Sequence, residues 1–346
     1  MRLINKVTRE IIRIINQFLK IINCNYRIVK NYAPIIENIS DTEKLNDIIG
    51  KHSDYWIIMP LSAFGDSLVV FKLIKKFKEE RGGRVLILSN EERILQLAKM
   101  FDSIDKSILI TNNDFSDNIF TGALTKIVIG KLFATHFYIN FIFNKTSSNM
   151  LTRARAFLEI NNETYGESPI FSKESRDFAK EFIENNNMKD DKIILITPFA
   201  TTMNDKSLKV NFWNELAIKL EKNGYKVVFN SHKDSKISND FIKFMPNIEI
   251  ITAFSSLCHC VIGFRSGILD VIRDGSDVRM IAIYNLDHCT SMLYQDFDVD
   301  KNKSPIENYI NCCSLNTMYN KNNTLELIYQ GDEEAFKAEL LGYFLT

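Results

Sequence analysis

The stretch that decides the fold reads YWIIMPLSAFGDSLVVFKLIKKFKEERGG over residues 55–83. Its first five residues, Tyr55 to Met59, form a continuous apolar run that is typical of a buried strand. From Asp66 to Glu80 the apolar residues recur at helical spacing, and Gly82-Gly83 follow, as glycines do where helices end. The stretch therefore predicts a strand, a short loop and a helix in succession.

The same alternation continues on both sides of a join near residues 165–190. Before the join, we expect further strands at 85–88, 107–110, 126–129 and 136–141 and a helix at 91–101. After it, we expect helices at 173–187, 210–222 and 332–344 and strands at 192–197, 225–229, 248–251, 260–262 and 279–284. Strands that alternate with helices form parallel sheets covered on both faces. The sequence thus predicts an α/β protein with two Rossmann-like, doubly wound domains, at 49–172 and 173–330, flanked by an N-terminal segment (1–48) and a C-terminal helix (331–346).

Composition narrows the class of protein. The 346 residues suffice for two domains of about 100–200 residues each. Lys plus Arg and Asp plus Glu both number 43, and this zero balance argues against a dedicated nucleic-acid-binding protein. Six cysteines are too few for a disulfide scaffold, and Cys258-His259-Cys260 lacks the spacing of a zinc site. No run of about 18 apolar residues occurs, so we expect a cytoplasmic protein without a spanning helix.

The N-terminal segment has its own character. Residues 1–32 carry seven Lys or Arg against one Glu, and their isoleucines recur at helical spacing. We therefore expect a basic amphipathic helix over residues 1–24. Such a helix either lies on an anionic membrane surface, which would make the protein peripheral on the inner face of the cytoplasmic membrane, or packs on the protein itself. The sequence leaves both possibilities open.

Three strand-to-helix loops could carry chemistry, because ligands of parallel sheets bind at the carboxyl ends of the strands. The first, 60–66, places Asp66 beside Gly65 at a helix start, where it would act as a helix cap or as a reactive carboxylate. The second, 198–206, offers the hydroxyls of Thr201 and Thr202 and the charge of Lys206. The third, 262–270, has the backbone amides of a helix N-terminus, which can face an anion. Its Arg265 adds a guanidinium that fits phosphate oxygens.

Taken in order, these loops resemble the signatures of the heptosyltransferase-like (glycosyltransferase family 9-like) enzymes, which have the GT-B fold. Ser62-Ala63-Phe64-Gly65-Asp66 matches an S-A-x-G-D loop after the first strand. Ala200 to Lys206, followed by Phe212-Trp213, is similar to a hydroxyl-rich loop with a lysine before an aromatic-containing helix. Gly263 to Asp270 is similar to a G-x-[DS]-[ST]-G-x-x-H loop. The resemblance covers residues 55–285.

The resemblance implies two Rossmann-like domains that face a central cleft, with the acceptor on the N-terminal domain and a nucleotide-sugar donor on the C-terminal one. It implies an inverting glycosyltransferase that needs no metal or other cofactor and acts on a glycan or lipid-linked acceptor, such as a lipopolysaccharide or capsule precursor. Asp66 matches the general base. The expected donor- and substrate-binding residues are Ser62, Gly65, Thr201, Thr202, Lys206, His232, Arg265, Ser266, Gly267, Ile268 and Asp270.

Two residues depart from the family pattern. Arg265 stands where the third loop has Asp or Ser, and Asp270 stands where it has His. These departures favour a sugar nucleotide other than ADP-heptose. They also leave open a catalytically degenerate protein that binds a glycan or a partner, or a GT-B enzyme that uses a CMP-sugar or epimerises a sugar nucleotide.

Overall fold

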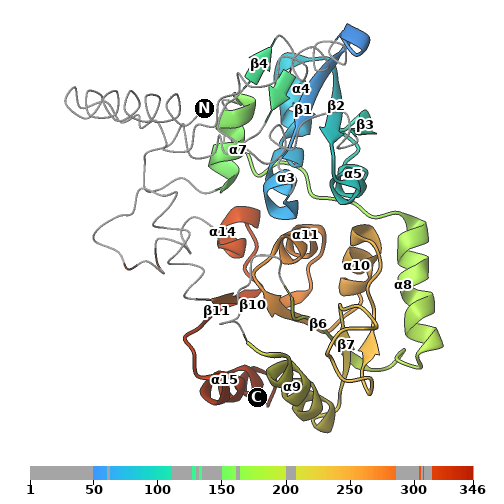
Figure 1. Cartoon of the computed structure of the whole chain (residues 1–346), viewed down its shortest axis with the longest axis vertical. Helices are drawn as coiled ribbons and strands as arrows, with labels where there is room; N and C mark the ends of the chain where they lie inside the picture. The colour runs from blue at the N-terminus through green and yellow to red at the C-terminus, as the bar shows by residue number, and fades with distance from the viewer. Residues whose placement is uncertain are drawn as a thin grey trace, which may run out of the picture. The chain divides into compact units, whose positions relative to one another are not determined.

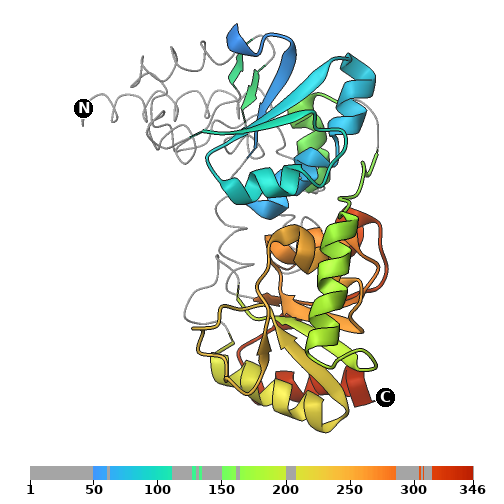
Figure 2. The same cartoon turned by 90° about the vertical axis from the view of Figure 1, so that its right-hand side faces the viewer.

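The computed structural model describes residues 50–60, 63–110, 127–129, 132–134, 150–160, 164–199, 208–285, 304, 307 and 314–345. The chain divides into two compact units, and the division falls between Glu167 and Ser168. Each unit contains a predominantly parallel sheet with helices around it (Figures 1 and 2). The N-terminal helix expected at 1–24 and the strand expected at 136–141 lie outside the described residues. Within the described part, no helix is both long and apolar enough to cross a membrane.

Unit 1 is built on a five-stranded sheet with the order β3-β2-β1-β5-β4. Its strands are β1 (Tyr55–Met59), β2 (Arg84–Ser89), β3 (Lys106–Leu109), β4 (Ile127–Ile129) and β5 (Leu132–Ala134). Its described helices are α3 (Phe64–Phe71), α4 (Ile74–Arg81), α5 (Glu92–Ala98) and α7 (Met150–Leu158). The central strand β1 runs parallel to both β2 and β5, whereas β4 is antiparallel to β5.

The helix expected over residues 66–80 is two helices, α3 and α4, which meet at Lys72 and Leu73. A contact distant in sequence explains the break. The backbone amide of Glu167 donates to the Lys72 carbonyl at 2.9 Å, which takes the place of a helical bond there. The Lys72 ammonium, on a buried side chain, donates to the Glu167 carbonyl at 3.2 Å. Nothing in the sequence around Lys72 indicates this pair of hydrogen bonds with Glu167, so the apolar periodicity predicted a single helix.

Unit 2 is built on a six-stranded, fully parallel sheet with the order β11-β10-β9-β6-β7-β8. Its strands are β6 (Lys192–Thr197), β7 (Tyr225–Phe229), β8 (Ile242–Lys243), β9 (Cys260–Phe264), β10 (Arg279–Asn285) and β11 (Thr324–Tyr329). Its helices are α8 (Lys173–Asn185), α9 (Val210–Lys222), α10 (Ile248–Ser255), α11 (Gly267–Gly275), α14 (Leu315–Tyr319) and α15 (Glu333–Leu345).

Successive residues of the central unit 2 strands β6, β9 and β10 are buried on opposite faces, as a parallel sheet between two helical layers requires. Ile194, Ile196 and Ile262 pack into one core together with residues of α9 and α15, such as Phe212 and Phe336. The alternate residues face the other layer, in which α10 contacts both α8 and α11 (Figure 1). Both faces of the sheet are therefore shielded from solvent, which is why these strands are continuous apolar runs in the sequence.

The prediction of a strand at residues 248–251 is wrong, because these residues begin α10. The Asn247 side chain accepts a hydrogen bond from the Ile250 amide at 2.9 Å and thereby caps the helix. Ile248 and Ile251 are both buried, together with most of the helix. An apolar run that is buried nearly all round looks the same in a short helix and in a strand, which is why periodicity gave the wrong element.

Candidate functional site

Each sheet has a point at which its strand order reverses. In unit 1 the chain runs outward from β1 through β2 to β3, and β5 lies on the other side of β1. In unit 2 it runs from β6 through β7 to β8, and then from β9 through β10 to β11 in the opposite direction. At such a topological switch point, the loops that follow two neighbouring strands run to opposite faces of the sheet. Ligands bind in the crevice that this leaves at the carboxyl ends of the strands. The switch points are at β1–β5 and at β6–β9.

In unit 1, the loop after β1 leads directly into α3. Ala63 occupies the N-cap position of α3 and makes no side-chain capping bond, so Asp66 is not the cap residue. Asp66 lies in the first turn, next to Gly65, and both are partly exposed. The helix dipole favours a negative charge at this position. A partly exposed carboxylate at a switch point is placed to meet a substrate. Ser62 lies outside the described residues.

In unit 2, β6 ends at Thr197 and β9 passes beside it. The Thr197 hydroxyl donates to the Ile262 carbonyl at 3.4 Å, and Thr197 is paired in register with Gly263. The loop that follows β6, with Thr201, Thr202 and Lys206, lies outside the described residues. The partner loop of the switch point, which follows β9, is described in full.

This second loop begins with Arg265, whose backbone amide donates to the Ile283 carbonyl of β10 at 2.8 Å. Ser266 is the N-cap residue of α11 in an extended conformation and makes no side-chain capping bond. Arg265, Ser266, Gly267 and Ile268 are all partly exposed, whereas the helix is buried from Leu269 to Asp274. The first turn of α11 therefore meets solvent at the switch point, where its amide dipoles favour an anion.

Asp270 has a different environment from its neighbours. Its side chain is 1% exposed and accepts two hydrogen bonds, one on each carboxylate oxygen. Arg265 Nη1 donates to Oδ2 at 2.5 Å, and the Tyr319 hydroxyl donates to Oδ1 at 2.9 Å. Burial raises the pKa of Asp270, against the opposing effects of the Arg265 charge and the Tyr319 hydrogen bond. Burial and the Asp270 charge also raise the pKa of Tyr319, so its hydroxyl remains a donor. Asp270 therefore faces Arg265 and Tyr319.

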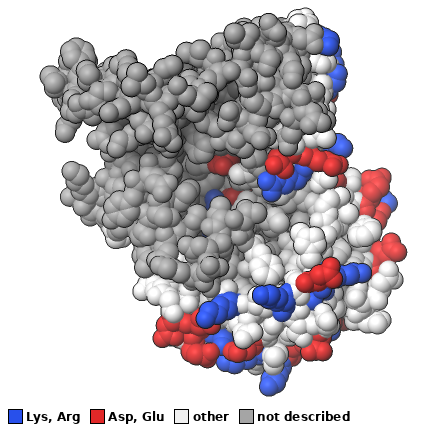
Figure 3. All heavy atoms as spheres, viewed as in Figure 1, with Lys and Arg blue, Asp and Glu red and all other residues white. Residues whose placement is uncertain are grey.

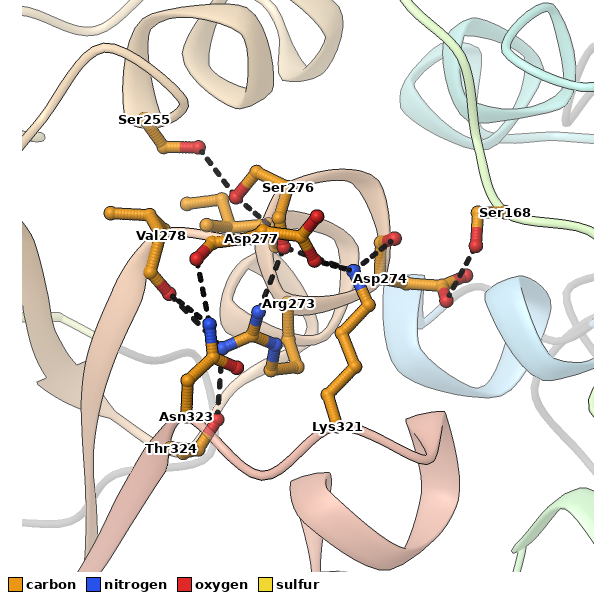
Figure 4. A network of polar contacts seen from close by, with 11 residues as sticks. Ser168, Ser255, Arg273, Asp274, Ser276, Asp277, Val278, Lys321, Asn323 and Thr324 are labelled. Carbon is orange, nitrogen blue, oxygen red and sulfur yellow. Dashed lines mark hydrogen bonds and ion pairs between the residues drawn. The ribbon is translucent and has the colours of Figure 1, made fainter.

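The other end of α11 is held by a second polar network, drawn in Figure 4. The guanidinium of Arg273, which is fully buried, donates to the carbonyls of Ser276 and Val278 and to the Thr324 hydroxyl. From the opposite side of the turn, the Lys321 ammonium donates to the carbonyls of Asp274 and Ser276. These contacts satisfy carbonyls at the end of the helix and tie it to the start of β11. The network thus holds the C-terminal end of α11, the helix that begins two residues after Arg265.

His232, the remaining predicted residue, lies on an exposed loop after β7. Its carbonyl accepts hydrogen bonds from the Ser235 amide and the Ser231 hydroxyl, both at 3.1 Å. Because β7 is the neighbour of β6 on the side away from β9, His232 lies one strand from the switch point. The sequence analysis missed Tyr319, which lies on a five-residue helix that the predicted strand–helix alternation did not include and has no motif around it.

The described residues include no cluster of three or more His, Cys, Asp or Glu side chains that could hold a metal ion. On the face drawn in Figure 3, the described Lys and Arg side chains are interspersed with Asp and Glu, in line with the zero net charge. Among the described residues, the Arg265 guanidinium contributes a cationic group beside the unit 2 switch point.

Comparison with known proteins identifies this fold. No protein-family model and no curated protein matches the sequence. Among solved structures, the chain is similar to the ADP-heptose lipopolysaccharide heptosyltransferase II of E. coli, with a TM-score of 0.57 and 12% identity over 84% of this chain and 98% of that one. It is also similar to a family 9 glycosyl transferase of Veillonella parvula (TM-score 0.53, 12% identity, 83% and 89% covered). The E. coli heptosyltransferase WaaC, solved with ADP, gives a TM-score of 0.52 at 13% identity over 84% and 98% of the two chains.

These similarities define a mixed α/β fold with parallel sheets, shared with glycosyltransferases. More particularly, it is the fold of the heptosyltransferases and of glycosyltransferase family 9. The resemblance inferred from the three loops is thereby confirmed at the level of the fold.

Proposed function

We propose that this protein is a glycosyltransferase that moves a sugar from a nucleotide-sugar donor to a cell-surface glycan precursor of the lipopolysaccharide or capsule kind. The observation that carries the proposal is the fold, which it shares with heptosyltransferases over nearly their whole length. In support, Asp66 and the segment Arg265–Ile268, two elements of the resemblance, lie at the carboxyl ends of β1 and β9, where parallel sheets bind ligands.

In this proposal, unit 2 binds the donor. The leaving group is a nucleoside diphosphate, and the charge that grows on it must be stabilised by cations or oriented dipoles. Arg265 and the first-turn amides of α11 supply both, and Lys206 with the hydroxyls of Thr201 and Thr202 would complete the phosphate site. His232 would contact the nucleotide from the neighbouring loop. This set of groups stabilises the leaving diphosphate without a metal ion.

Unit 1 would bind the acceptor and supply the base. Asp66 takes the proton of the acceptor hydroxyl as its oxygen attacks the anomeric carbon of the donor sugar. The carbon–oxygen bond to the diphosphate breaks on the opposite side, so the configuration at the anomeric carbon inverts. The N-terminal segment 1–24 would place the enzyme at the membrane surface, close to a lipid-linked acceptor.

The proposal is tested by titrating the purified full chain with ADP, UDP, GDP, CDP and CMP in a thermal-shift assay and then by calorimetry. A ligand at 100 times its dissociation constant stabilises the folded state by about 2.7 kcal/mol, which raises Tm by a few degrees. We expect one nucleotide to stabilise the protein in this way. We expect Lys206→Ala and Arg265→Ala to lower the affinity for that nucleotide. Stabilisation by none of the five would contradict the proposal. Stabilisation by a nucleotide other than ADP would support a donor different from ADP-heptose.

The Arg265–Asp270 ion pair favours a second candidate, because it occupies both positions that depart from the family pattern. In this alternative the protein keeps the fold and binds a nucleotide or glycan without turnover. The two functions are distinguished by incubating the protein with the sugar form of the nucleotide that it binds and an acceptor preparation. Release of the nucleotide at a rate that depends on Asp66 identifies an enzyme.

A further inference from the structure

We infer that Tyr319 is a positioning residue, which holds the Arg265 guanidinium at the donor site through the buried carboxylate of Asp270; this inference rests on the proposed function. Neither the sequence motifs nor the resemblance assigns Tyr319 a role. The chain of contacts runs from Tyr319 on α14 to Asp270 in the first turn of α11, and from there to Arg265, which precedes that helix.

Asp270 is the central member of this chain. Its two oxygens bind different partners, Oδ2 with Arg265 and Oδ1 with Tyr319, and the side chain is almost completely shielded from water. Removal of one partner from a buried carboxylate leaves a charge or an acceptor unsatisfied, which is costly in a medium of low polarity. The carboxylate therefore keeps a fixed orientation only while both donors are present.

Tyr319 is itself held in place by contacts outside its own helix. A helix of five residues has little stability alone, so α14 depends on its surroundings. The Glu326 carboxylate of β11 accepts hydrogen bonds from the Ser314 hydroxyl at 2.7 Å and from the Leu315 amide at 2.8 Å, at the start of α14. The Asn316 side chain donates to the same carboxylate at 3.2 Å. With the helix start fixed on β11, Tyr319 at the helix end reaches Asp270.

The consequence falls on Arg265. Its side chain is 14% exposed, and its Nη2 approaches Met318 Sδ at 3.9 Å, so α14 contacts the guanidinium both directly and through Asp270. An arginine that is fixed before its ligand arrives loses less side-chain entropy on binding than a mobile one. Tyr319 thus contributes to anion affinity without touching the anion, by restricting where the guanidinium can lie.

The experiment is a double-mutant cycle on nucleotide affinity, measured by calorimetry on the full chain with ADP, UDP, GDP, CDP and CMP. Tyr319→Phe, which removes a single oxygen, is expected to raise the dissociation constant of the nucleotide that binds by about five- to tenfold. In the Arg265→Ala background, Tyr319→Phe is expected to have no further effect. The nucleoside of the same base has no phosphate and should bind the unaltered protein and Tyr319→Phe with equal affinity. Purely structural damage would instead lower the affinity for the nucleoside and for the nucleotide alike.

Tyr225→Phe is the matched control, because the Tyr225 hydroxyl also donates one hydrogen bond, to the Phe344 carbonyl at 3.1 Å, and lies on β7, on the far side of β6 from β9. It should leave affinity unchanged. If Tyr319→Phe does not fold, Asp270→Asn takes its place in the cycle. Weakening by Tyr319→Phe that persists without Arg265 would overturn this inference alone. Binding of none of the five nucleotides (ADP, UDP, GDP, CDP and CMP) to the unaltered protein would overturn the proposed function, and this inference with it.

Discussion

Gly263 of β9 faces Thr197 of β6 so closely that a Cβ atom at position 263 would lie 1.8 Å from the Thr197 hydroxyl oxygen and 2.6 Å from its carbonyl oxygen. The two residues are paired in register at the carboxyl end of β6. Since the loops of the proposed donor site leave from these strand ends, the close approach of the two backbones sets the spacing between the loops.

Gly263→Ala is therefore expected to destabilise the protein by about 2 kcal/mol, as overpacking of a dry interior does. The strands must separate or Thr197 must change rotamer, and either change moves Arg265, two residues along the chain. Urea unfolding measures the loss of stability, and calorimetry measures the weaker nucleotide binding that should accompany it. Gly342→Ala is the control, because a Cβ atom there meets nothing within 4 Å and lies in a helix, where alanine is favoured. Equal stabilities of the two variants would contradict the account.

The sequence predicted the elements of unit 2 best where local signals sufficed. The bounds of β6, α9 and β7 agree with the predicted ranges 192–197, 210–222 and 225–229. Buried apolar runs mark both strands, and Asn223-Gly224 ends α9, with Gly224 at φ +82°, a conformation that glycine adopts without strain. These signals lie within a few residues of the elements they define.

The failures came from contacts between distant residues. The hydrogen bonds between Glu167 and Lys72 divide one expected helix into two, and Tyr319 reaches Asp270 across 49 residues of sequence. Of the predicted site, the sequence could place Asp66 and Arg265 at strand ends but could not show that Asp270 is buried against Arg265. The motif predicted that Asp270 binds the donor. In our proposal the buried Asp270 carboxylate instead positions Arg265.

The Arg273 network makes a prediction about stability. Arg273→Met keeps most of the volume of the buried side chain but leaves the carbonyls of Ser276 and Val278 and the Thr324 hydroxyl without this donor. Buried acceptors that lose their partner cost about 1–3 kcal/mol each before relaxation, so we expect a net loss of about 3 kcal/mol in urea unfolding. Arg279→Met, at an exposed arginine with one hydrogen bond to the Tyr343 carbonyl, should cost under about 1 kcal/mol. A smaller loss for Arg273→Met than for Arg279→Met would show that the network is dispensable.

Acid stability should depend on Asp105 in unit 1. Its partial burial raises the pKa, but the hydrogen bonds from Lys78 Nζ and the Val85 amide, both at 2.7 Å, outweigh this and leave the pKa below its ordinary value. A carboxyl group whose pKa is lower in the folded state contributes stability above its unfolded-state pKa of about 3.9 and loses it as pH falls through the folded-state value.

Asp105→Asn should therefore lower the free energy of unfolding at neutral pH, by no more than about 1 kcal/mol because the ion pair is partly exposed. The difference from the unaltered protein should shrink as pH falls below about 4. Urea unfolding over a series of pH values measures both effects. Lys78→Met should remove part of the same pH dependence, since it deletes one of the two donors. A difference that grows in acid would have the wrong sign for this account.

The proposed catalytic base makes the last prediction. Asp66→Asn keeps the size and the first-turn position of the side chain but cannot accept a proton, so kcat for sugar transfer should fall at least ~100-fold. The KM for the donor should change less than about threefold, because the donor is assigned to unit 2. Nucleotide release from the sugar nucleotide found by the binding panel measures both constants. Glu92→Gln is the matched control, as Glu92 also lies in the first turn of a unit 1 helix, α5, so the same loss of charge at a helix start should leave kcat unchanged. If Asp66→Asn retained most of its turnover, or if NMR showed that the anomeric configuration of the product is retained, Asp66 could not be the base of an inverting transfer.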